Sequence, residues 1–315
     1  MPTRKSPRKG SLQFWPRKRA EKFLPSVNWD AINLSDSKKI LKGFICYKAG
    51  MTSLSVKDLT PNSMTKDKKI AIPVTILECP PIKILSARFY KNGRVATEVL
   101  AESLDKEIKR KIKIPKKSKK YEGTKKEDYD DLRIIAYSVV KKTGIKKTPD
   151  ITELGLNGSY EEKLNFVKEN LGKEISVLNN FEKGELVDLR GLTKGKGLQG
   201  PVKRFGLNLK AHKSEKGVRR PGSLGPWHPA RVTFRVPMAG QMGLFTRIVY
   251  NNKIVDLGKE EKKFTNLKNY GNVNSEYIIV KGSVQGPSKR QLILTHALRE
   301  TKKQKKKVYN FIETR

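Results

Sequence analysis

Residues 191–247 read GLTKGKGLQGPVKRFGLNLKAHKSEKGVRRPGSLGPWHPARVTFRVPMAGQMGLFTR, and the rest of the chain must support this stretch. Twelve of its residues are Lys or Arg, ten are Gly, five are Pro, and Glu215 is its only acid. Gly and Pro are unfavourable inside helices and sheets, and no apolar period of helix or strand runs between Gly191 and Ala230. A stretch this long without its own core is either disordered or ordered by a partner.

Planar side chains stand singly among these cations, namely Phe205, His212, Trp227 and His228. In irregular folded RNA, bases stack on rings or guanidinium planes while amines meet phosphates. A flexible solvated linker is the alternative, but a disordered linker is usually monotonous in composition. We therefore predict that this stretch binds RNA.

Residues 195–200 spell G-x-G-x-x-G after a predicted strand, as in a dinucleotide-binding turn. That fold requires an apolar helix next and an acid about 20 residues further on. Here the cationic, Gly-broken residues 201–206 follow, and no Asp or Glu occurs between Lys216 and Val255. No Gly-Lys-Ser/Thr is present either, so the sequence argues against a nucleotide-binding enzyme.

The overall charge of the chain also favours binding to a nucleic acid. The chain has 315 residues, with 68 Lys and Arg against 31 Asp and Glu, which gives a formal net charge of +37. Such a charge favours a polyanionic partner. No 18-residue apolar run and no secretory signal are apparent, so we expect no membrane association and a cytoplasmic location. Cys46, Cys79 and three scattered His form no metal-ligand pattern.

The remaining chain reads as many short strands between turns, which favours a small closed barrel. A basic arm rich in Pro precedes them and a Lys cluster follows them at residues 299–307. Alternation from Ala230 to Val236 predicts one more half-buried strand with cations on its open face. The other strands are expected at 40–56 (two strands about a turn at Gly50), 70–78, 82–90, 94–101, 132–140, 175–178, 185–189, 246–250, 253–257, 277–281 and 291–295.

Two helices are predicted between these strands. Ser159 begins the clearer one, because Ser159 and Glu162 form a capping box and apolar residues follow at helical spacing as far as Leu171. The Lys-rich run 102–126 is expected to be helical until Pro115. Residues 86–172 therefore resemble an α+β insert in a β-rich chain.

Several motifs in this order resemble the universal large-subunit ribosomal protein L-three family in its archaeal form. They are GSLQFWPRKRA and GFICYKAGMT near the start, GLTKGKGLQGPVKRFG, RRPGSLGPWHPARV and VPMAGQMGLFTR in the basic stretch, and IIVKGSVQGP near the end. The span from His212 to Gly217 is longer than in eukaryotic relatives, so the sequence departs from the family pattern around His212.

The resemblance implies a mainly β fold: a small translation-factor-like β-barrel with an α+β insert, a long irregular basic finger loop and extended basic tails. The expected parts are a basic N-terminal arm (1–39), the barrel (40–85 and 173–298), the insert (86–172), the finger loop (191–229) and a basic C-terminal tail (299–315). It further implies a structural constituent of the large ribosomal subunit that binds 23S-type ribosomal RNA early in assembly. The finger loop, with its tip at residues 226–229, is expected to reach toward the peptidyl transferase centre.

Neighbouring large-subunit proteins of the L-fourteen and L-twenty-four types are the other partners implied. No cofactor, metal, small-molecule substrate or homo-oligomer is expected. The residues expected to contact RNA are Arg4, Lys5, Arg8, Lys9, Phe14, Trp15, Arg17, Lys18, Arg19, Lys194, Lys196, Gln199, Lys203, Arg204, Phe205, Lys210, His212, Lys213, Arg219, Arg220, Trp227, His228, Arg231, Arg235, Gln241, Arg247, Lys289 and Arg290.

Two other classes compete with a structural RNA-binding protein. An RNA-modifying enzyme would need converging acids, an activated nucleophile or a metal set, and we expect no carboxylate that could orient His212 or His228. A DNA-binding protein would need a recognition helix, and the one well-capped helix is not basic. A non-ribosomal RNA-binding protein also stays open at this point.

Overall fold

The computed structural model describes the chain except for residues 1–3, 6, 35–38, 116–128, 260–263 and 315. The described residues are mainly β-strand with few helices, which confirms the predicted fold class at that level. The chain divides into two compact units. The first unit comprises residues 1–22 and 192–246, and the second comprises residues 23–191 and 247–315.

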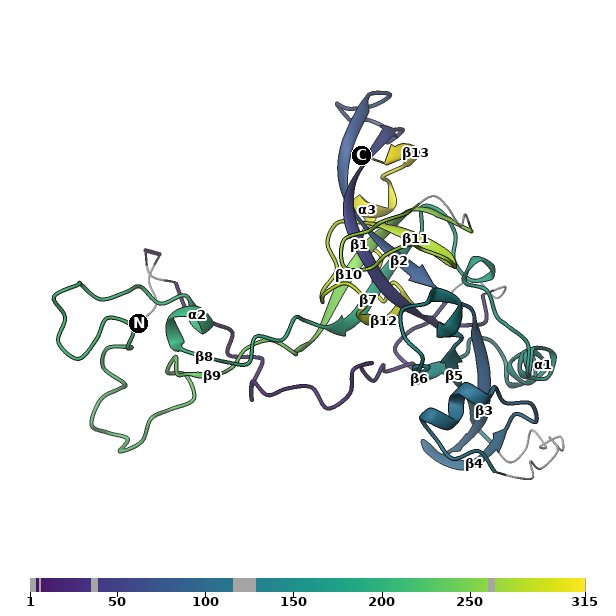
Figure 1. The fold of residues 1–315 in the computed structure, drawn as a ribbon, viewed down its shortest axis with the longest axis horizontal. Helices are drawn as coiled ribbons and strands as arrows, with labels where there is room; N and C mark the ends of the chain where they lie inside the picture. Colours follow the sequence, from purple (N-terminus) through teal and green to yellow (C-terminus); the bar gives the residue numbers. More distant parts are fainter. Residues whose placement is uncertain (1–3, 6, 35–38, 116–128, 260–263, 315) are drawn as a thin grey trace. The chain divides into compact units, whose positions relative to one another are not determined.

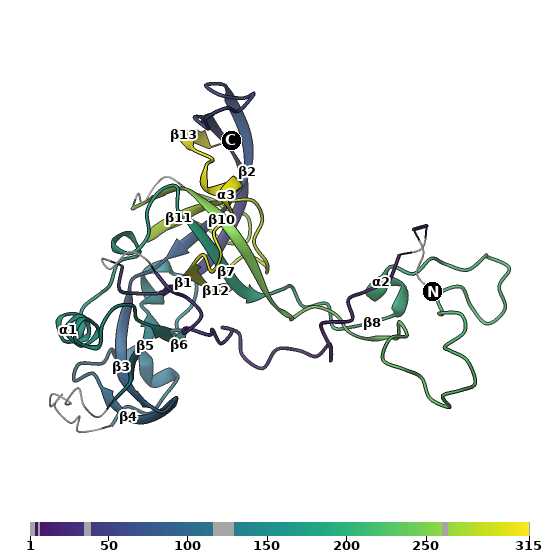
Figure 2. The same ribbon diagram turned by 180° about the vertical axis from the view of Figure 1, so that it is seen from behind.

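Seven strands of the second unit form one antiparallel sheet in the order β12-β7-β10-β11-β2-β1-β13. An additional pairing joins β1 to β12, so that six of these strands form a closed series. The long neighbours β1 and β2 run side by side, and β13 lies beside one end of β1 (Figures 1 and 2). The strands are β1 (Gly43–Asp58), β2 (Lys69–Cys79), β7 (Leu186–Leu192), β10 (Thr246–Gly258), β11 (Glu276–Lys281), β12 (Gln291–His296) and β13 (Tyr309–Thr314).

Alternating apolar residues hold this sheet together, as the period of 2 requires. In β7, Val187 and Leu189 belong to the main apolar core, and Leu189 pairs with the fully buried Leu294 of β12. Burial of a Leu side chain stabilises the fold by roughly 1.5–3 kcal/mol. Truncation of Leu294 to Ala would cost about 2–5 kcal/mol, because a cavity would be added to the lost burial.

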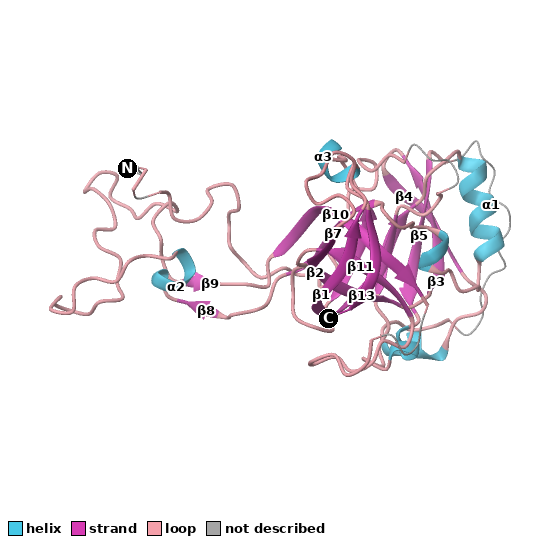
Figure 3. Ribbon diagram, turned by 90° about the horizontal axis from the view of Figure 1, so that it is seen from above, coloured by secondary structure: helices cyan, strands magenta, loops and turns pink. Residues whose placement is uncertain are grey.

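The second sheet has the order β4-β3-β5-β6, and helix α1 lies beside it (Figure 3). Its strands are β3 (Ile82–Lys91), β4 (Arg94–Leu100), β5 (Asp131–Ser138) and β6 (Ile151–Gly155). The predicted capping box of α1 (Tyr160–Asn170) is confirmed, since the Ser159 hydroxyl accepts from the Glu162 amide and the Glu162 carboxylate from the Ser159 amide. Val167 of α1 is buried in the main core.

Short helical turns complete the second unit. They are the 3-10 helices η1 (Lys106–Arg110), η3 (Val140–Thr143) and η4 (Val177–Asn179), together with α3 (Lys302–Lys305). The first unit contains α2 (Pro201–Phe205) and the two-residue strands β8 (Leu198–Gln199) and β9 (Gly240–Gln241).

Two predicted breaks between strands are wrong, because the strands continue through them. The turn at Gly50 is instead a bulge inside the continuous strand β1, where pairing passes from Lys48↔Leu77 to Gly50↔Ile76. Likewise, 246–250 and 253–257 are one strand, β10, in which Asn251 adopts a left-handed φ of 56°. Asn tolerates that conformation better than most residues.

Three other local predictions are wrong. Ile175 makes only an isolated bridge with Ile82, and the 3-10 turn η4 follows instead of a strand. The Lys-rich run contains only η1 between Glu102 and Pro115, and its residues 116–126 lie outside the described residues. Residues 230–236 form no strand, because no segment among the described residues pairs with them, and the alternating apolar side chains stay largely exposed.

Strands β6, β8, β9 and β13 were not predicted. β13 lies in the expected basic tail and pairs with β1, for example Phe311 with Val56. That pairing places an ordered strand where the composition suggested only an extended basic segment.

Candidate RNA-binding surface

The outgoing and returning halves of the basic stretch are joined by backbone hydrogen bonds in the first unit. The Thr193 amide donates to the Phe245 carbonyl at 3.0 Å, and the Lys196 amide donates to the Met242 carbonyl at 2.9 Å. The strands β8 and β9 pair next to these bonds. The backbone conformation at Gly243 has φ 78°, and a Cβ there would lie 1.9 Å from the Lys194 carbonyl oxygen, so only Gly fits.

Helix α2 follows as a single short turn. Pro201 occupies its first position, which suits the fixed φ of Pro, and Gly206 ends it with a left-handed φ of 67°. Arg204 then ties α2 to the returning half, since Nε donates to the Gln241 carbonyl at 3.0 Å and Nη1 to the Met238 carbonyl at 3.0 Å. Burial, followed by the charge of Arg17, lowers the pKa of the Arg204 guanidinium.

The N-terminal arm packs on the same unit. Arg8 donates from Nη2 to the Arg235 carbonyl at 2.7 Å. The Trp15 and Phe234 rings lie with centroids 5.3 Å apart. The Ala20 amide donates to the Leu244 carbonyl at 3.0 Å. The structure thus gathers the arm and the basic stretch, which are far apart in sequence, into one body.

All the residues expected to contact RNA lie in the first unit except Arg247, Lys289 and Arg290. Most of them are exposed. Those that are partly buried are Lys9, Arg17, Gln199, Arg204, Phe205, Gln241, Arg247 and Arg290. The exposed ones are Arg4, Lys5, Arg8, Phe14, Trp15, Lys18, Arg19, Lys194, Lys196, Lys203, Lys210, His212, Lys213, Arg219, Arg220, Trp227, His228, Arg231, Arg235 and Lys289.

Trp227 is the most exposed aromatic side chain of the surface, with 85% of its area accessible. It lies in a segment of loop structure, as Figure 3 shows for nearly all of this unit. An indole this exposed is unfavourable in water unless a partner covers it. Trp227 therefore presents an exposed aromatic ring in a hollow that Arg231 also lines, and an exposed ring beside a cation suits stacking on nucleic-acid bases.

The charge of the first unit is almost entirely positive. Glu21 and Glu215 are its only acids, and Glu21 lies 3.9 Å from Lys18 across an exposed pair. An exposed pair of this kind contributes little to stability. The cations of the surface thus have almost no acidic counter-charge within the unit, which favours a polyanionic partner.

Two of the three remaining residues, Lys289 and Arg290, lie in one turn of the second unit. The buried Lys48 holds this turn, because its Nζ donates to the Val284 carbonyl at 2.5 Å and to the Gly286 carbonyl at 3.2 Å. The Arg290 guanidinium lies 5.3 Å from the ring centroid of Phe23. Burial lowers the pKa of Arg290.

Sequence reasoning missed Phe23 and assigned Phe234 to a strand face. Phe23 follows the run RKRAEK, so an aromatic residue directly after a cation cluster was the available signal. Nothing in the sequence marked Phe234 as the partner of Trp15.

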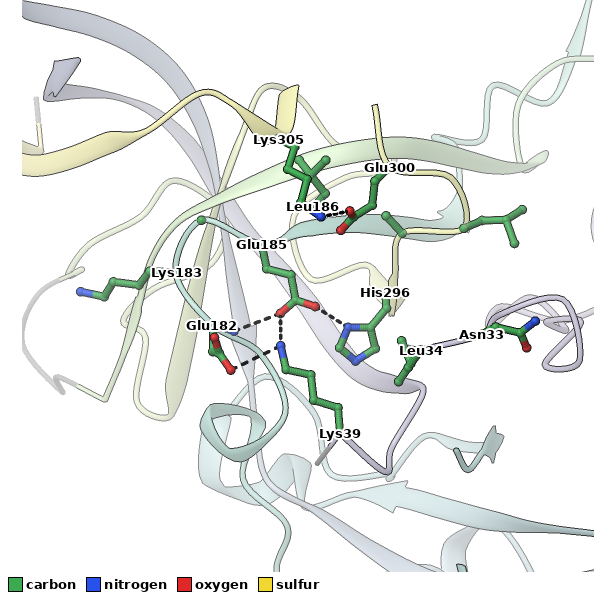
Figure 4. Close-up of a pocket in the computed structure, with 13 residues that line it drawn as sticks. Asn33, Leu34, Lys39, Glu182, Lys183, Glu185, Leu186, His296, Glu300 and Lys305 are labelled. Atoms are coloured by element: carbon green, nitrogen blue, oxygen red, sulfur yellow. Dashed lines mark hydrogen bonds and ion pairs between the residues drawn. The ribbon is translucent and has the colours of Figure 1, made fainter. Parts of the chain in front are cut away.

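One polar cavity of about 540 Å³ in the second unit is a candidate enzyme site (Figure 4). Glu185 lies between Lys39 and His296, with Lys39 Nζ at 3.1 Å from Oε2 and His296 Nδ1 at 2.5 Å from Oε1. The other ring nitrogen of His296 faces the Asn180 amide at 3.4 Å. These groups satisfy one another, and no nucleophile stands beside the imidazole among the described residues that line the cavity, so the geometry is that of a structural ion network.

Two further findings concern only the part of the chain that the structure describes. It contains no group of three or more His, Cys, Asp or Glu placed to hold a metal ion. None of its helices is long and apolar enough to cross a membrane.

Comparison with known proteins decides the family. The family model described as ribosomal protein L3 matches residues 1–315. The chain belongs to the ribosomal protein L3 family. A large ribosomal subunit protein uL3 from Methanocaldococcus jannaschii is 42% identical over 310 residues, covering 93% of this chain and 91% of the relative.

Other archaeal members of the L3 family agree. The uL3 of Methanococcus vannielii is 43% identical over 309 residues, with 93% of this chain and 91% of the relative covered. That of Methanothrix thermoacetophila is 40% identical over 319 residues, with 95% and 93% covered. The resemblance read from the motifs is therefore confirmed, and members of the L3 family are structural components of the ribosome rather than enzymes.

Proposed function

We propose that this L3-family chain is a structural constituent of the large ribosomal subunit that binds 23S-type ribosomal RNA through its first unit. The observation that carries this proposal is the pairing of a dense exposed cation set with only two acids, Glu21 and Glu215, in one compact unit. Exposed rings within the set, Trp15 and Trp227 among them, supply stacking surfaces. The individual residues named above are the proposed contacts.

We also propose which parts of the chain form the barrel, the insert, the finger loop and the tails. The closed series of six strands is proposed to be the translation-factor-like barrel, with residues 86–172 as its insert, 191–229 as the finger loop, 1–39 as the basic arm and 299–315 as the tail. The ring of pairings from β12 through β1 supports the barrel. The second sheet with α1 supports the insert, although β3 begins at Ile82, four residues earlier than proposed.

The place of the chain in the subunit follows from its family. We infer that it joins ribosomal RNA early in assembly in the cytoplasm and that residues 226–229 approach the peptidyl transferase centre. Neighbours of the L-fourteen and L-twenty-four types would contact the second unit. The exposure of Trp227 supports a tip that is covered by RNA.

The salt dependence of binding to transcribed 23S-type ribosomal RNA tests the proposal. If on the order of ten cations meet phosphates, log affinity should fall against log salt with a slope near −7 to −9. The variant Lys194→Ala/Lys196→Ala/Lys203→Ala should reduce the slope by about 2–3, because exposed Lys contacts to phosphate act nearly independently.

A matched control removes three exposed Lys of the second unit that lie outside the proposed set, Lys66, Lys68 and Lys91. It should leave both slope and affinity nearly unchanged. A flat salt dependence of the wild-type protein would contradict an electrostatic interface, and equal losses in the two triple variants would contradict its placement on the first unit.

A further inference from the structure

The only two cysteines in the sequence lie opposite one another on neighbouring strands of the second unit. Cys46 belongs to β1, and Cys79 is the last residue of β2. The register pairs Tyr47 with Glu78, so the next pair of this antiparallel ladder is Cys46 with Cys79. Both side chains are fully buried in the main apolar core, and both are free thiols.

The backbone hydrogen bonds of β1 show which kind of cross-strand pair the cysteines form. The Lys48 amide donates to the Arg290 carbonyl at 2.9 Å, and the Lys48 carbonyl accepts from the Lys289 amide at 2.8 Å, so both groups face the β12 side of β1. The bulge of β1 begins only after Lys48, and these groups alternate in direction along a regular strand, so those of Cys46 face β12 as well. Cys46 and Cys79 therefore form a non-hydrogen-bonded pair.

A non-hydrogen-bonded pair is the position at which side chains of two antiparallel strands approach most closely. The Cα atoms of such a pair lie about 4.5 Å apart, which falls within the range of about 4.4–6.8 Å found across disulfides. The two thiols also interact directly, since burial, followed by a hydrogen bond with Cys46, raises the pKa of the Cys79 thiol. The two sulfurs can therefore bond without separation of the strands.

We propose that Cys46 and Cys79 form a thiol–disulfide exchange site, at which a low-molecular-weight disulfide such as oxidised glutathione joins β1 to β2 covalently. One cysteine thiolate attacks the reagent, forms a mixed disulfide with it and releases one glutathione thiol. The second cysteine thiolate then attacks the protein sulfur of the mixed disulfide and releases the other glutathione thiol. The protein gives up two electrons and two protons, and the reagent takes up both.

The burial of the pair decides when this exchange takes place. A buried thiol that keeps its proton reacts slowly, so the closed sheet protects both the dithiol and the disulfide. The reaction therefore belongs to folding, or to opening of β1 from β2, when the two sulfurs reach solvent. Once formed, the bond is shielded from external thiols, and such shielding lets a disulfide persist in a reducing compartment.

The bond would tie the base of the long β1–β2 hairpin. It would close residues 47–78 into a loop in the unfolded chain, and this constraint stabilises the folded state. Because β2 ends at Cys79 and β3 begins at Ile82, the bond would also fix the point where the chain passes from the first sheet to the second. The alternative is a pair of cysteines that only fill space as small apolar residues. That alternative predicts no change in stability with an oxidant.

Refolding of the full chain from urea, with and without oxidised glutathione, tests the site. With the oxidant, the folded protein should be lighter by two hydrogen atoms, and proteolysis should yield a peptide that contains Cys46 linked to one that contains Cys79. The thermal midpoint should rise by roughly 4–12 °C, and dithiothreitol should reverse this rise quickly in urea but slowly in native buffer. If the chain does not refold, the same oxidant is added to folded protein held just below its thermal midpoint, where the strands open.

Cys46→Ala and Cys79→Ala are the matched controls, because each keeps one thiol and cannot form the internal bond. Lost packing should lower the midpoint of both variants equally with and without oxidant, so only the oxidant-dependent rise reports the covalent bond. Two free thiols after oxidation, two glutathione adducts on one chain, or links between chains in place of the internal bond would overturn the inference. An internal bond that lowers the midpoint would overturn it as well, because the pair would then be strained rather than placed for bonding.

Discussion

The guanidinium of Arg17 lies over the ring of Phe205, with Cζ 4.8 Å from the ring centroid. The same ring leaves no space for a side chain at Gly10, where a Cβ would lie 2.7 Å from Cδ1 of Phe205. One aromatic residue of the basic stretch therefore contacts the N-terminal arm at two points. This relationship explains how a segment without an apolar core gains a defined surface.

We predict that Phe205→Ala loosens the arm. A cation–π contact at a partly exposed site contributes about 0.5–1 kcal/mol, so opening of the arm should become roughly two to five times more frequent. Amide exchange at Ala20, whose N–H donates to the Leu244 carbonyl at 3.0 Å, reports this opening. Leu198→Ala, at a side chain 78% exposed in the same unit, should leave that exchange unchanged.

The Glu185 carboxyl in the ion network of Figure 4 should make the stability of the fold depend on pH. Burial alone would raise the pKa of its carboxyl, but His296 and then Lys39 hold that pKa below its usual value. A carboxyl with a lowered pKa in the folded state stabilises above its unfolded pKa of about 4.3, and that stability is lost as pH falls through the folded pKa.

We therefore predict that Glu185→Gln lowers the free energy of unfolding by about 1.5–3 kcal/mol at pH 7, because a charged acceptor of two bonds is lost. The difference between wild type and variant should shrink as pH falls below about 4. Urea unfolding at a series of pH values from about 3.5 to 7 measures both quantities. Glu102→Gln, at an exposed residue, is the control, and a gap that stays constant with pH would show that the carboxylate charge is not responsible.

The sequence predicted best those elements whose signal is local. The capping box at Ser159 and the apolar runs of β2, β3 and β5 depend on neighbouring residues, and the structure confirms them. Prediction failed where a partner strand decides the outcome. Gly50 could mark a turn or a bulge, and only the pairing with β2 settles it.

Some features of the candidate site could likewise be predicted from the sequence, and others could not. Unopposed charge between Lys216 and Val255 can be read directly from the sequence, whereas the internal role of Arg204 cannot. A cation bonded to two carbonyls and a cation open to phosphate look identical in sequence.

Amide exchange across the basic stretch should vary with the backbone hydrogen bonds. From Arg219 to Ala230, the Gly225 amide is the one described donor, and it reaches the Ser223 hydroxyl at 3.4 Å. We predict fast exchange there in the free protein and strong protection in β7 and β12, whose pairing runs from Val187 to Gly191. Addition of 23S-type ribosomal RNA should slow exchange in 219–230, and equal protection before and after addition would contradict an RNA-bound surface.

The last prediction separates assembly from function at the proposed tip. Trp227 is 85% exposed, so its replacement by Ala removes no protein core. Stacking on a base is worth roughly 1–3 kcal/mol, which is small against an interface of many phosphate contacts. Trp227→Ala should therefore enter large subunits at nearly the normal level. The loss should appear as altered peptide transfer, because the proposed tip approaches that centre.

Charge reversal should have the opposite profile. Lys203, Arg219 and Arg220 are exposed and have no ion pair among the described residues, so Glu at these positions would repel phosphates and impair assembly itself. Arg204→Glu is expected to disturb the protein first, because it breaks bonds to the Gln241 and Met238 carbonyls. Sucrose-gradient profiles and a peptide-transfer assay on each variant measure the two effects. Trp227→Ala subunits that fail to assemble, or that assemble and react normally, would show that Trp227 does not stand at a functional tip.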